Sequence, residues 1–394
     1  MSRKLTVVQL LPALESGGVE RSTIEIADAL VRAGHRAIVV SAGGRLLPTL
    51  QATGAEHVAL DIGRKSIATL RHVGGLRRLF AQTRADIVHA RSRLPAWIGH
   101  LALNGLAARK PHFVTTVHGL NSPSRYSAIM ARGERVVCVS QTVRDYVLRH
   151  YPATDPARLH VIPRGIAVSA FPRAAWPDHD ARARAAALHP QLAGDGPLLL
   201  LPGRGTRLKG HADALALLAA LRGDGLDARL WMPGAREATR ADYLVELERL
   251  SMRLGVAAAV AMTPPTAAIA EAYAASDLVL QLSRKPESFG RTVIEALAVG
   301  RPVLGWAHGG VGELLQALQP QGAVVPFDAD ALARVARTLL AQAPALAVTM
   351  PDMRHDTLLG DYSLQAMQDA TLACYTDIAD DRRAADSSDE HRGR

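Results

Sequence analysis

The chain has 394 residues, of which 48% are hydrophobic and 21% are charged, a composition typical of globular proteins and a length that favours two domains. Aromatic residues make up only 4%, which argues against stacking platforms for nucleic acid, and no run of about eighteen apolar residues predicts a membrane-spanning helix. The two cysteines, Cys138 and Cys374, fit neither a disulfide framework nor a metal-binding spacing, so we expect buried thiols in a reducing cytoplasm.

The net charge of +9 is distributed unevenly along the chain. Residues 1–170 contain 23 Lys and Arg against 10 Asp and Glu, a charge of +13, whereas the remainder contains 23 against 27, a charge of −4. This asymmetry supports two domains and indicates an anionic partner for the first one, such as a membrane surface, a phosphorylated lipid-linked acceptor or nucleic acid. Solvated charge without a partner is the alternative.

The first part of the chain alternates short β-branched runs with amphipathic segments, the pattern of βαβ units around a parallel sheet. The N-terminal run, interrupted by Gln9 and Pro12, indicates a buried strand rather than a leader peptide. A helix is expected over 19–34, with Gly34 just past its end. The expected strands are 5–11, 36–41, 56–60, 86–90, 112–117, 135–140 and 159–163.

A second series of the same kind follows a break in periodicity. We predict an N-terminal domain over 1–170, a linker over 171–197, a C-terminal domain over 198–360, an amphipathic helix over 361–379, and a disordered tail over 380–394. The expected strands of the second domain are 198–203, 227–234, 258–262, 277–282, 301–306 and 322–326. The predicted fold class is α/β, with two doubly wound Rossmann-like domains that face each other across a cleft and bind ligands at the carboxyl ends of their strands.

Two glycine-containing loops follow the first strand of each half. Gly17 and Gly18 come directly before a helix, so their amides and the helix dipole can bind an anion, although a plain tight turn is about as well supported. In PGRGTRLKGH (202–211), Arg204 and Lys209 can reach one diphosphate from two sides. Neither loop has the G-x-G-x-x-G or Walker A pattern, which disfavours a dinucleotide enzyme and a nucleotide triphosphatase.

The stretch SRKPESFGRTVIEALAVGRP (283–302) combines a strand end, a loop and a helix. Amides around Phe289, Gly290, Arg291 and Thr292 start this helix and can hold a phosphate. Glu295, one turn further, is suited to accept hydrogen bonds from a ribose diol, and Glu287 on the loop is suited to contact a sugar. Taken alone, the two glutamates would more often be solvated surface charges.

Other polar candidates carry less information. His118 follows a predicted strand at its carboxyl end and can hydrogen-bond a sugar, although a lone histidine is more often structural. Asp-x-Asp occurs at 178–180 and at 328–330, where neither copy follows a strand of the expected cleft, so we expect no metal site.

Seven elements together resemble the family-4 retaining glycosyltransferases of the GT-B fold. They are the Gly-Gly loop with Glu-Arg after the first strand, AGH at 33–35, HG at 118–119, SQTVRDY at 140–146, PRG at 163–165, the loop from Arg204 to Gly210, and ESFGRTVIE at 287–295. The last element is similar to the family's E-x7-E motif. The resemblance extends over residues 5–380, because the elements occur in the family's order and in matching strand and loop contexts.

The resemblance implies roles for the residues above. Arg204 and Lys209 would bind the pyrophosphate of a nucleotide sugar and stabilise the leaving group, Glu295 would hold the ribose, and Glu287 would contact the sugar beside the amides of 289–292. Gly17 and Gly18 would lie by the phosphate and the acceptor, and His118 by the donor sugar. The helix over 361–379 would pack back on the first domain, as the family's C-terminal helix does. No metal or cofactor is implied, and a UDP- or GDP-linked sugar is the expected donor.

The reaction implied is front-face substitution with retention at the anomeric carbon, in which the leaving phosphate takes the acceptor proton. RSRLPAW (91–97), TTVHGL (115–120) and SRKPESFGRT (283–292) look similar to enzymes of bacterial lipopolysaccharide core or surface-glycan synthesis. That similarity implies an anionic glycolipid or polysaccharide acceptor and peripheral binding to the inner face of the cytoplasmic membrane. The basic residues proposed to face it are Arg64, Lys65, Arg71, Arg77, Arg78, Arg91 and Arg93.

Several rival functions stay open at this point. Within the same fold they are a nucleotide-sugar hydrolase or epimerase and a transferase with a soluble acceptor. From other classes they are a nucleotide-binding protein without catalysis and a nicotinamide-dependent dehydrogenase.

Overall fold

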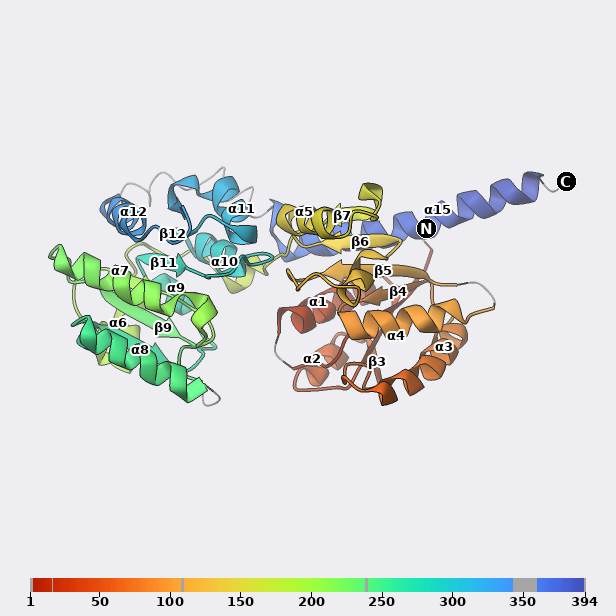
Figure 1. Cartoon of the computed structure of the whole chain (residues 1–394), viewed down its shortest axis with the longest axis horizontal. Coiled ribbons are helices and arrows are strands. Elements are labelled where there is room, and N and C mark those ends of the chain that lie inside the picture. Colours follow the sequence, from red (N-terminus) through yellow and green to blue (C-terminus); the bar gives the residue numbers. More distant parts are fainter. Residues whose placement is uncertain (1–2, 16, 108–109, 238–239, 343–359, 393–394) are drawn as a thin grey trace. The chain divides into compact units, whose positions relative to one another are not determined.

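The structure is a computed structural model of the chain, and it describes residues 3–15, 17–107, 110–237, 240–342 and 360–392, with side chains to Asp381 (Figure 1). The chain divides into two compact units, Met1–Pro163 with Leu364–Arg394, and Arg164–Ser363. We describe each unit by itself.

The first unit is built on a seven-stranded parallel sheet with the order β3-β2-β1-β4-β5-β6-β7. Its strands are β1 (Thr6–Leu10), β2 (Arg36–Ser41), β3 (Glu56–Ala59), β4 (Ile87–Ala90), β5 (His112–Val117), β6 (Arg135–Cys138) and β7 (Leu159–Val161). Its main helices are α1 (Gly18–Arg32), α2 (Leu47–Ala52), α3 (His72–Thr83), α4 (Arg93–Asn104) and α5 (Gln141–His150). Each of the seven strands expected from the sequence is therefore found.

Burial on both faces explains why the central strand β1 is mostly apolar. Val7 and Val8 of β1 are fully buried, and β1 lies between β2 and β4, with Val7 in register with Ala37 and Ile87. Helix α1 adds Ile24 and Ala27 to this core. The chain leaves α1 through Gly34, whose φ of 79° lies in the left-handed region that favours glycine.

The C-terminal helix α15 (Leu364–Arg392) belongs to the first unit (Figure 1, blue). Met367, Tyr375 and Ile378 join the core of this unit, and the hydroxyl of Tyr375 lies 2.5 Å from His89 Nδ1 on β4. Gln368 Nε2 donates to the carbonyl of Glu25 on α1 at 2.7 Å. The helix is thus tied to the unit by both apolar packing and buried hydrogen bonds.

The second unit contains a six-stranded parallel sheet with the order β10-β9-β8-β11-β12-β13. Its strands are β8 (Leu198–Leu200), β9 (Arg229–Pro233), β10 (Val260–Thr263), β11 (Leu278–Gln281), β12 (Val303–Trp306) and β13 (Ala323–Val324). Its helices are α6 (His179–Leu188), α7 (His211–Gly223), α8 (Ala241–Arg253), α9 (Ile269–Ala275), α10 (Arg291–Val299), α11 (Gly309–Leu318) and α12 (Ala329–Ala341). Both sheets have Rossmann-like parallel topology, as predicted.

The unit boundaries differ from those expected. The segment predicted as a linker, 171–197, belongs to the second unit, because α6 packs against α9 and buries Ala181 and Ala185. The N-terminal part of the first unit ends at Pro163, and the second unit runs from Arg164 to Ser363, where a parallel β-bridge joins Ser363 to Ile166. The helix predicted over 361–379 begins at Leu364 and continues through most of the tail that was expected to be disordered.

Among the described residues, no helix is both long and apolar enough to span a membrane.

Candidate functional site

Two loops of the second unit lie next to each other because their strands are neighbours in the sheet. β8 pairs with β11, so the loop after β8 and the loop after β11 both leave the carboxyl edge of the sheet. The amide of Arg284 donates to the carbonyl of Leu208 at 2.8 Å and ties the loops together. Gly210 allows this approach, since its φ is 76° and a Cβ there would lie 2.1 Å from the carbonyl oxygen of Leu282.

This contact brings two of the predicted residues together. Lys209 Nζ lies 2.5 Å from Glu287 Oε1, and both side chains are about three-quarters buried, with exposed fractions of 29% and 26%. The Ser283 hydroxyl also donates to Glu287 Oε1 and lies 3.1 Å from Gln281 Oε1. The carboxylate of Glu287 is therefore fixed by the ammonium group of Lys209 and the hydroxyl of Ser283, and it is not a solvated surface charge.

Arg204 is placed differently from Lys209. Its side chain is exposed, and it makes no ion pair with the residues that the structure describes. The neighbouring Arg207 instead forms an ion pair with Glu246 on α8 and lies over the ring of Tyr243. Arg204 is consequently an exposed cation in a loop that leaves the carboxyl edge of the sheet.

Two helix N-termini meet the Glu287 loop. Helix α10 begins after Gly290, and the amides of its first turn, at Arg291 and Thr292, have no acceptor within the helix. Helix α11 begins at Gly309, and the amide of Gly310 donates to the carbonyl of Glu287 at 2.7 Å. Both dipoles make this edge favourable for negative charge. The side chain of Phe289 is buried, so it can offer a ligand only its backbone.

Glu295 has partners of its own on α9 and α10. The hydroxyl of Tyr273 donates to Glu295 Oε2 at 2.9 Å, and Arg291 Nε lies 3.4 Å from Oε1. Tyr273 is almost completely buried, and burial together with the nearby carboxylate raises its pKa well above the usual value. This neutral phenol fixes one carboxylate oxygen. No contact joins Glu295 to Glu287 among the described residues, so the two glutamates occupy separate polar clusters.

The predicted residues of the first unit lie at the carboxyl edge of its own sheet. His118 follows β5 and is partly buried, and Gly17 is the N-cap of α1, the helix that follows the loop after β1. The carboxylate of Glu20 packs against Gly17, since a Cβ built there would lie 2.2 Å from Glu20 Oε2. The helix N-terminus therefore already has an anionic neighbour, while Gly18 is open, with nothing within 4 Å of its Cβ position.

Two arginines proposed to face a membrane do not form an exposed patch. Arg91 is 3% exposed, and it donates to Gln9 Oε1 at 2.6 Å and to the hydroxyl of Ser22 at 3.3 Å. Burial lowers the pKa of Arg91 from its usual value. Arg93 lies over the ring of Tyr126 and donates to a serine hydroxyl. That part of the prediction is wrong for Arg91, because it is a core cation that links β4 to β1 and α1.

Sequence reasoning missed Tyr273 and the segment His308, Gly309 and Gly310. His308 Nε2 lies 2.8 Å from the carbonyl of Ser283, so it supports the Glu287 loop from β12. A signal was present, because a glycine pair between a buried strand and the helix that follows it repeats the pattern at Gly17. Tyr273 had no comparable signal, since a tyrosine in an alanine-rich helix is normally core.

The two Asp-x-Asp segments both lie at the start of a helix. Asp178 accepts from the amide of Ala181 and caps α6, and Asp328 accepts from the amide of Ala331 and caps α12. Within the described part of the chain, no three His, Cys, Asp or Glu side chains are grouped so as to hold a metal ion.

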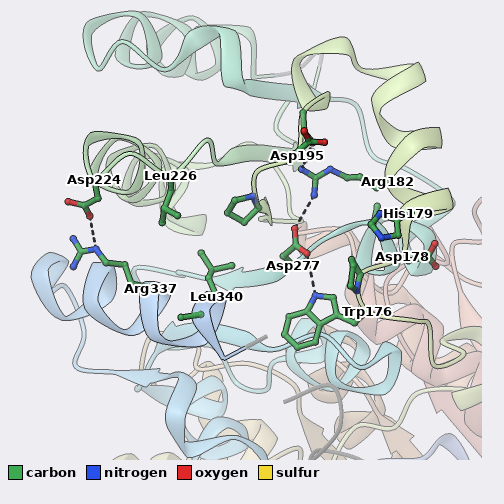
Figure 2. A pocket seen from close by; sticks show the side chains of 15 residues that line it. Trp176, Asp178, His179, Arg182, Asp195, Asp224, Leu226, Asp277, Arg337 and Leu340 are labelled. Atoms are coloured by element: carbon green, nitrogen blue, oxygen red, sulfur yellow. Dashed lines mark hydrogen bonds and ion pairs between the residues drawn. The ribbon is translucent and has the colours of Figure 1, made fainter. Parts of the chain in front are cut away.

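A pocket of about 790 Å³ lies at the opposite, amino-terminal edge of the second sheet (Figure 2). Its inner wall is organised by Asp277, which precedes β11 and accepts from Arg182 at 3.0 Å, from the Trp176 indole at 3.3 Å and from the amide of Leu198 at 2.7 Å. Its other wall includes Leu340 of α12. This pocket contains none of the predicted site residues.

Two family models match this chain, one in each half of the sequence. Residues 16–170 match the family described as Glycosyltransferase Family 4, and residues 189–351 match the one described as Glycosyl transferases group 1.

Curated relatives are similar over part of their length. A protein of Segniliparus rotundus named D-inositol 3-phosphate glycosyltransferase is 32% identical over 253 residues, which is 63% of this chain and 53% of the relative. A protein of the same name from Streptomyces coelicolor is 29% identical over 68% of this chain and 64% of its own length. The matched region thus spans between about half and two thirds of these relatives.

Solved structures are similar over nearly the whole chain. A glycosyltransferase from Rickettsia africae is 28% identical, with a TM-score of 0.84 over 95% of this chain and 98% of its own. Anabaena Alr3699/HepE, solved with UDP and glucose, is 20% identical with a TM-score of 0.78 over 94% and 99%. WaaG, a glycosyltransferase involved in lipopolysaccharide biosynthesis, is 19% identical with a TM-score of 0.67 over 93% and 99%. At 20% and 19% identity, the similarity to HepE and to WaaG shows a shared fold alone.

Proposed function

Because the chain belongs to the family 4 glycosyltransferases, with a group 1 domain as its second half, we propose that it moves a sugar from a nucleoside-diphosphate sugar to an acceptor hydroxyl. The donor binds the second unit, and the anomeric configuration is retained. The first unit carries the acceptor.

One observation carries the donor assignment. The carboxyl edge of the second sheet combines three features: the exposed Arg204, which has no ion pair among the described residues, the ion pair between Lys209 and Glu287, and the N-termini of α10 and α11. Cations and helix N-termini are suited to a diphosphate, and held carboxylates are suited to the hydroxyls of a sugar and a ribose. This set of groups fits a nucleotide sugar as a whole better than it fits a nucleotide or a sugar alone.

The chemistry we propose needs no nucleophile from the protein. The bond between the anomeric carbon and the diphosphate oxygen breaks, the acceptor oxygen bonds to that carbon on the same face, and the acceptor proton passes to the departing phosphate. Arg204 and Lys209 stabilise the charge that develops on the diphosphate. Glu287 orients the sugar, Glu295 holds the ribose, and the amides of 289–292 contact the phosphate. His118, Gly17 and Gly18 act from the first unit, on the sugar and the acceptor.

The acceptor we propose is an anionic glycolipid or polysaccharide, as in lipopolysaccharide core or related surface-glycan synthesis at the inner face of the cytoplasmic membrane. The charge of +13 on residues 1–170 supports an anionic acceptor. The names of the curated relatives favour a second candidate, a small phosphorylated cyclitol, which is also anionic. Both acceptors require the same donor chemistry.

A nucleotide-sugar panel tests the proposal. The full-length chain is melted with UDP-, GDP- and ADP-linked sugars and with NAD, and release of nucleoside diphosphate is then followed with and without acceptor. We expect stabilisation by one nucleotide class and release that increases with acceptor. Stabilisation by NAD alone would contradict the proposal, release that ignores every acceptor would indicate a hydrolase, and binding without release would indicate an inactive protein.

A further inference from the structure

We propose that residues 64–78 of the first unit form a docking surface for an anionic lipid bilayer, with Ile67 and Leu70 inserting between the head groups. This inference rests on the proposed function and deepens it, because it names the partner that presents the acceptor. We call these residues the docking segment. It comprises the turn before α3, the short 3-10 helix Ile67–Arg71 and the first two turns of α3.

The apolar part of the docking segment is unusually open. Ile67 is 87% exposed, more than any other large apolar side chain in the described chain, and Leu70 is 50% exposed. Single exposed apolar residues are common on protein surfaces and need no explanation. Here, two of them lie one turn apart in the same 3-10 helix, which places both on one side of the turn.

The docking segment is also strongly basic. No acidic residue occurs between Asp61 and Asp86. The cations of the docking segment are all exposed, and none forms an ion pair with a described residue; they are Arg64, Lys65, Arg71, Arg77 and Arg78. An unpaired basic cluster around an apolar tip is complementary to anionic head groups over an acyl interior. The segment has no exposed aromatic side chain, which disfavours single-stranded nucleic acid as the occupant.

The turn is held in the shape that exposes Ile67 and Leu70. Thr69 between them is 3% exposed, and its hydroxyl donates to the carbonyl of Arg64 at 2.6 Å. The Ser66 hydroxyl accepts from the amide of Ala68 at 3.2 Å. Since the inward side of the turn is anchored, the outward projection of its apolar side chains is a property of the folded unit, and docking needs little further ordering.

The position of the segment connects docking to the acceptor. It follows β3, an edge strand of the first sheet, and leaves that strand at its carboxyl end. Gly17, Gly18 and His118 lie at the same edge, after β1 and β5. A bilayer bound by the docking segment would therefore present its head groups to the edge of this unit that carries the proposed acceptor residues.

Vesicle sedimentation with the full-length chain tests the inference. The lipid is phosphatidylcholine alone or mixed with phosphatidylglycerol, each at low and at physiological salt. The apolar variant is Ile67→Ser with Leu70→Ser, and the charge variant is Arg64→Gln, Lys65→Gln and Arg71→Gln. The control is Leu188→Ser, which removes a side chain that is 74% exposed in the second unit. Melting temperatures establish that each variant is folded.

We expect the wild type and the Leu188→Ser control to bind only the anionic vesicles. Both docking variants should bind them roughly tenfold more weakly, because insertion and head-group attraction each contribute. Absence of wild-type binding, or equal binding by the apolar variant and the wild type, would overturn the inference. Displacement of the vesicles by RNA at equal charge would also overturn it, since the segment would then be a polyanion site.

Donor binding separates this inference from the proposed function. The nucleotide sugar that the wild type binds should raise the melting temperature of the docking variants by as much as that of the wild type. The reason is that the substitutions lie in the first unit, whereas the proposed donor site lies in the second. If the wild type bound anionic vesicles but no nucleotide sugar, docking would stand and the proposed function would fail. If it bound and turned over the donor but no vesicles, the function would stand and docking would fail.

Discussion

Lys209 Nζ lies 2.5 Å from Glu287 Oε1, so the cation and the carboxylate that we assign to the donor are partners of each other. A diphosphate that binds Lys209 has to compete with Glu287. Replacing Glu287→Gln removes this competitor, and we expect the affinity for the free nucleoside diphosphate to rise roughly fivefold, equivalent to about 1 kcal/mol. Sugar transfer should nevertheless fall, since the sugar loses its carboxylate.

Calorimetric titration measures the affinity for the nucleoside diphosphate, which should rise, and a transfer assay measures the rate of sugar transfer, which should fall. Glu246→Gln is the matched control, because Glu246 forms an ion pair with Arg207 of the same loop but belongs to α8 and not to the loop after β11. Weaker nucleotide binding by Glu287→Gln than by the wild type would show that Glu287 helps to hold the nucleotide and does not compete with it.

Lys209→Ala should act mainly on turnover. The ammonium is assigned to charge that develops as the diphosphate departs, and removing such a group typically lowers kcat by about 10² to 10³. Arg207→Ala removes one cation from the same loop after β8, and the guanidinium of Arg207 is engaged with Glu246 and Tyr243, so we expect near wild-type kcat. Equal losses in both variants would mean that only the overall charge of the loop matters.

Glu295 and Tyr273 should control recognition of the ribose. The Tyr273 hydroxyl donates to Glu295 Oε2, and a hydrogen bond to a charged group is worth about 1.5 to 3 kcal/mol. We expect Glu295→Gln to abolish the preference for a ribonucleotide over its 2′-deoxy analogue, and Tyr273→Phe to reduce it. Competition binding with the two nucleotides measures the preference, and an unchanged ratio in Glu295→Gln would remove the ribose assignment.

Arg301 should be essential to the stability of the second unit. It is fully buried and donates to the carbonyls of Ser276 at 2.9 Å and Ala274 at 2.7 Å, and to that of Ala175 in the segment before α6. Burial lowers its pKa to about 10. Arg301→Leu leaves these carbonyls without donors, and we expect a loss of about 3 to 5 kcal/mol in unfolding free energy.

Urea unfolding measures that loss, with the exposed Arg253→Leu as the control. A loss of less than about 1 kcal/mol for Arg301→Leu, within the ordinary range for a surface substitution, would contradict a structural role.

The stability of the second unit should fall in mild acid because of His211. Burial lowers the pKa of His211 to about 4 from a usual value of 6.5. The unfolded chain therefore binds a proton between pH 6.5 and pH 4 that the folded unit does not, so this contribution is complete above 6.5 and is lost as the pH falls to 4. Two and a half pKa units amount to about 3 kcal/mol.

Unfolding free energy measured at several pH values between these limits checks the slope. His211→Gln should flatten it, whereas His179→Gln, at an exposed position of α6, should leave it unchanged. An unchanged slope in His211→Gln would assign the acid sensitivity to other groups.

Strand positions and the parallel topology could be predicted from the sequence because they depend on local pattern. A strand buried on both faces needs a run of apolar residues, and LTVVQLL and DLVLQL show it whatever surrounds them. The loop that contains Arg204 and Lys209 and the loop that contains Glu287 could be identified for the same reason, since each follows an apolar run.

Only the tertiary structure decided which of these residues meet. Lys209 and Glu287 are 78 positions apart, and they come together because β8 and β11 are sheet neighbours, a pairing that no local pattern specifies. Arg91 looked like a surface cation in a basic sequence, but β1 and α1 supply buried acceptors for it. The contact between Tyr375 and His89, 286 residues apart, was likewise not visible in the sequence, because burying a polar group requires a partner from another element.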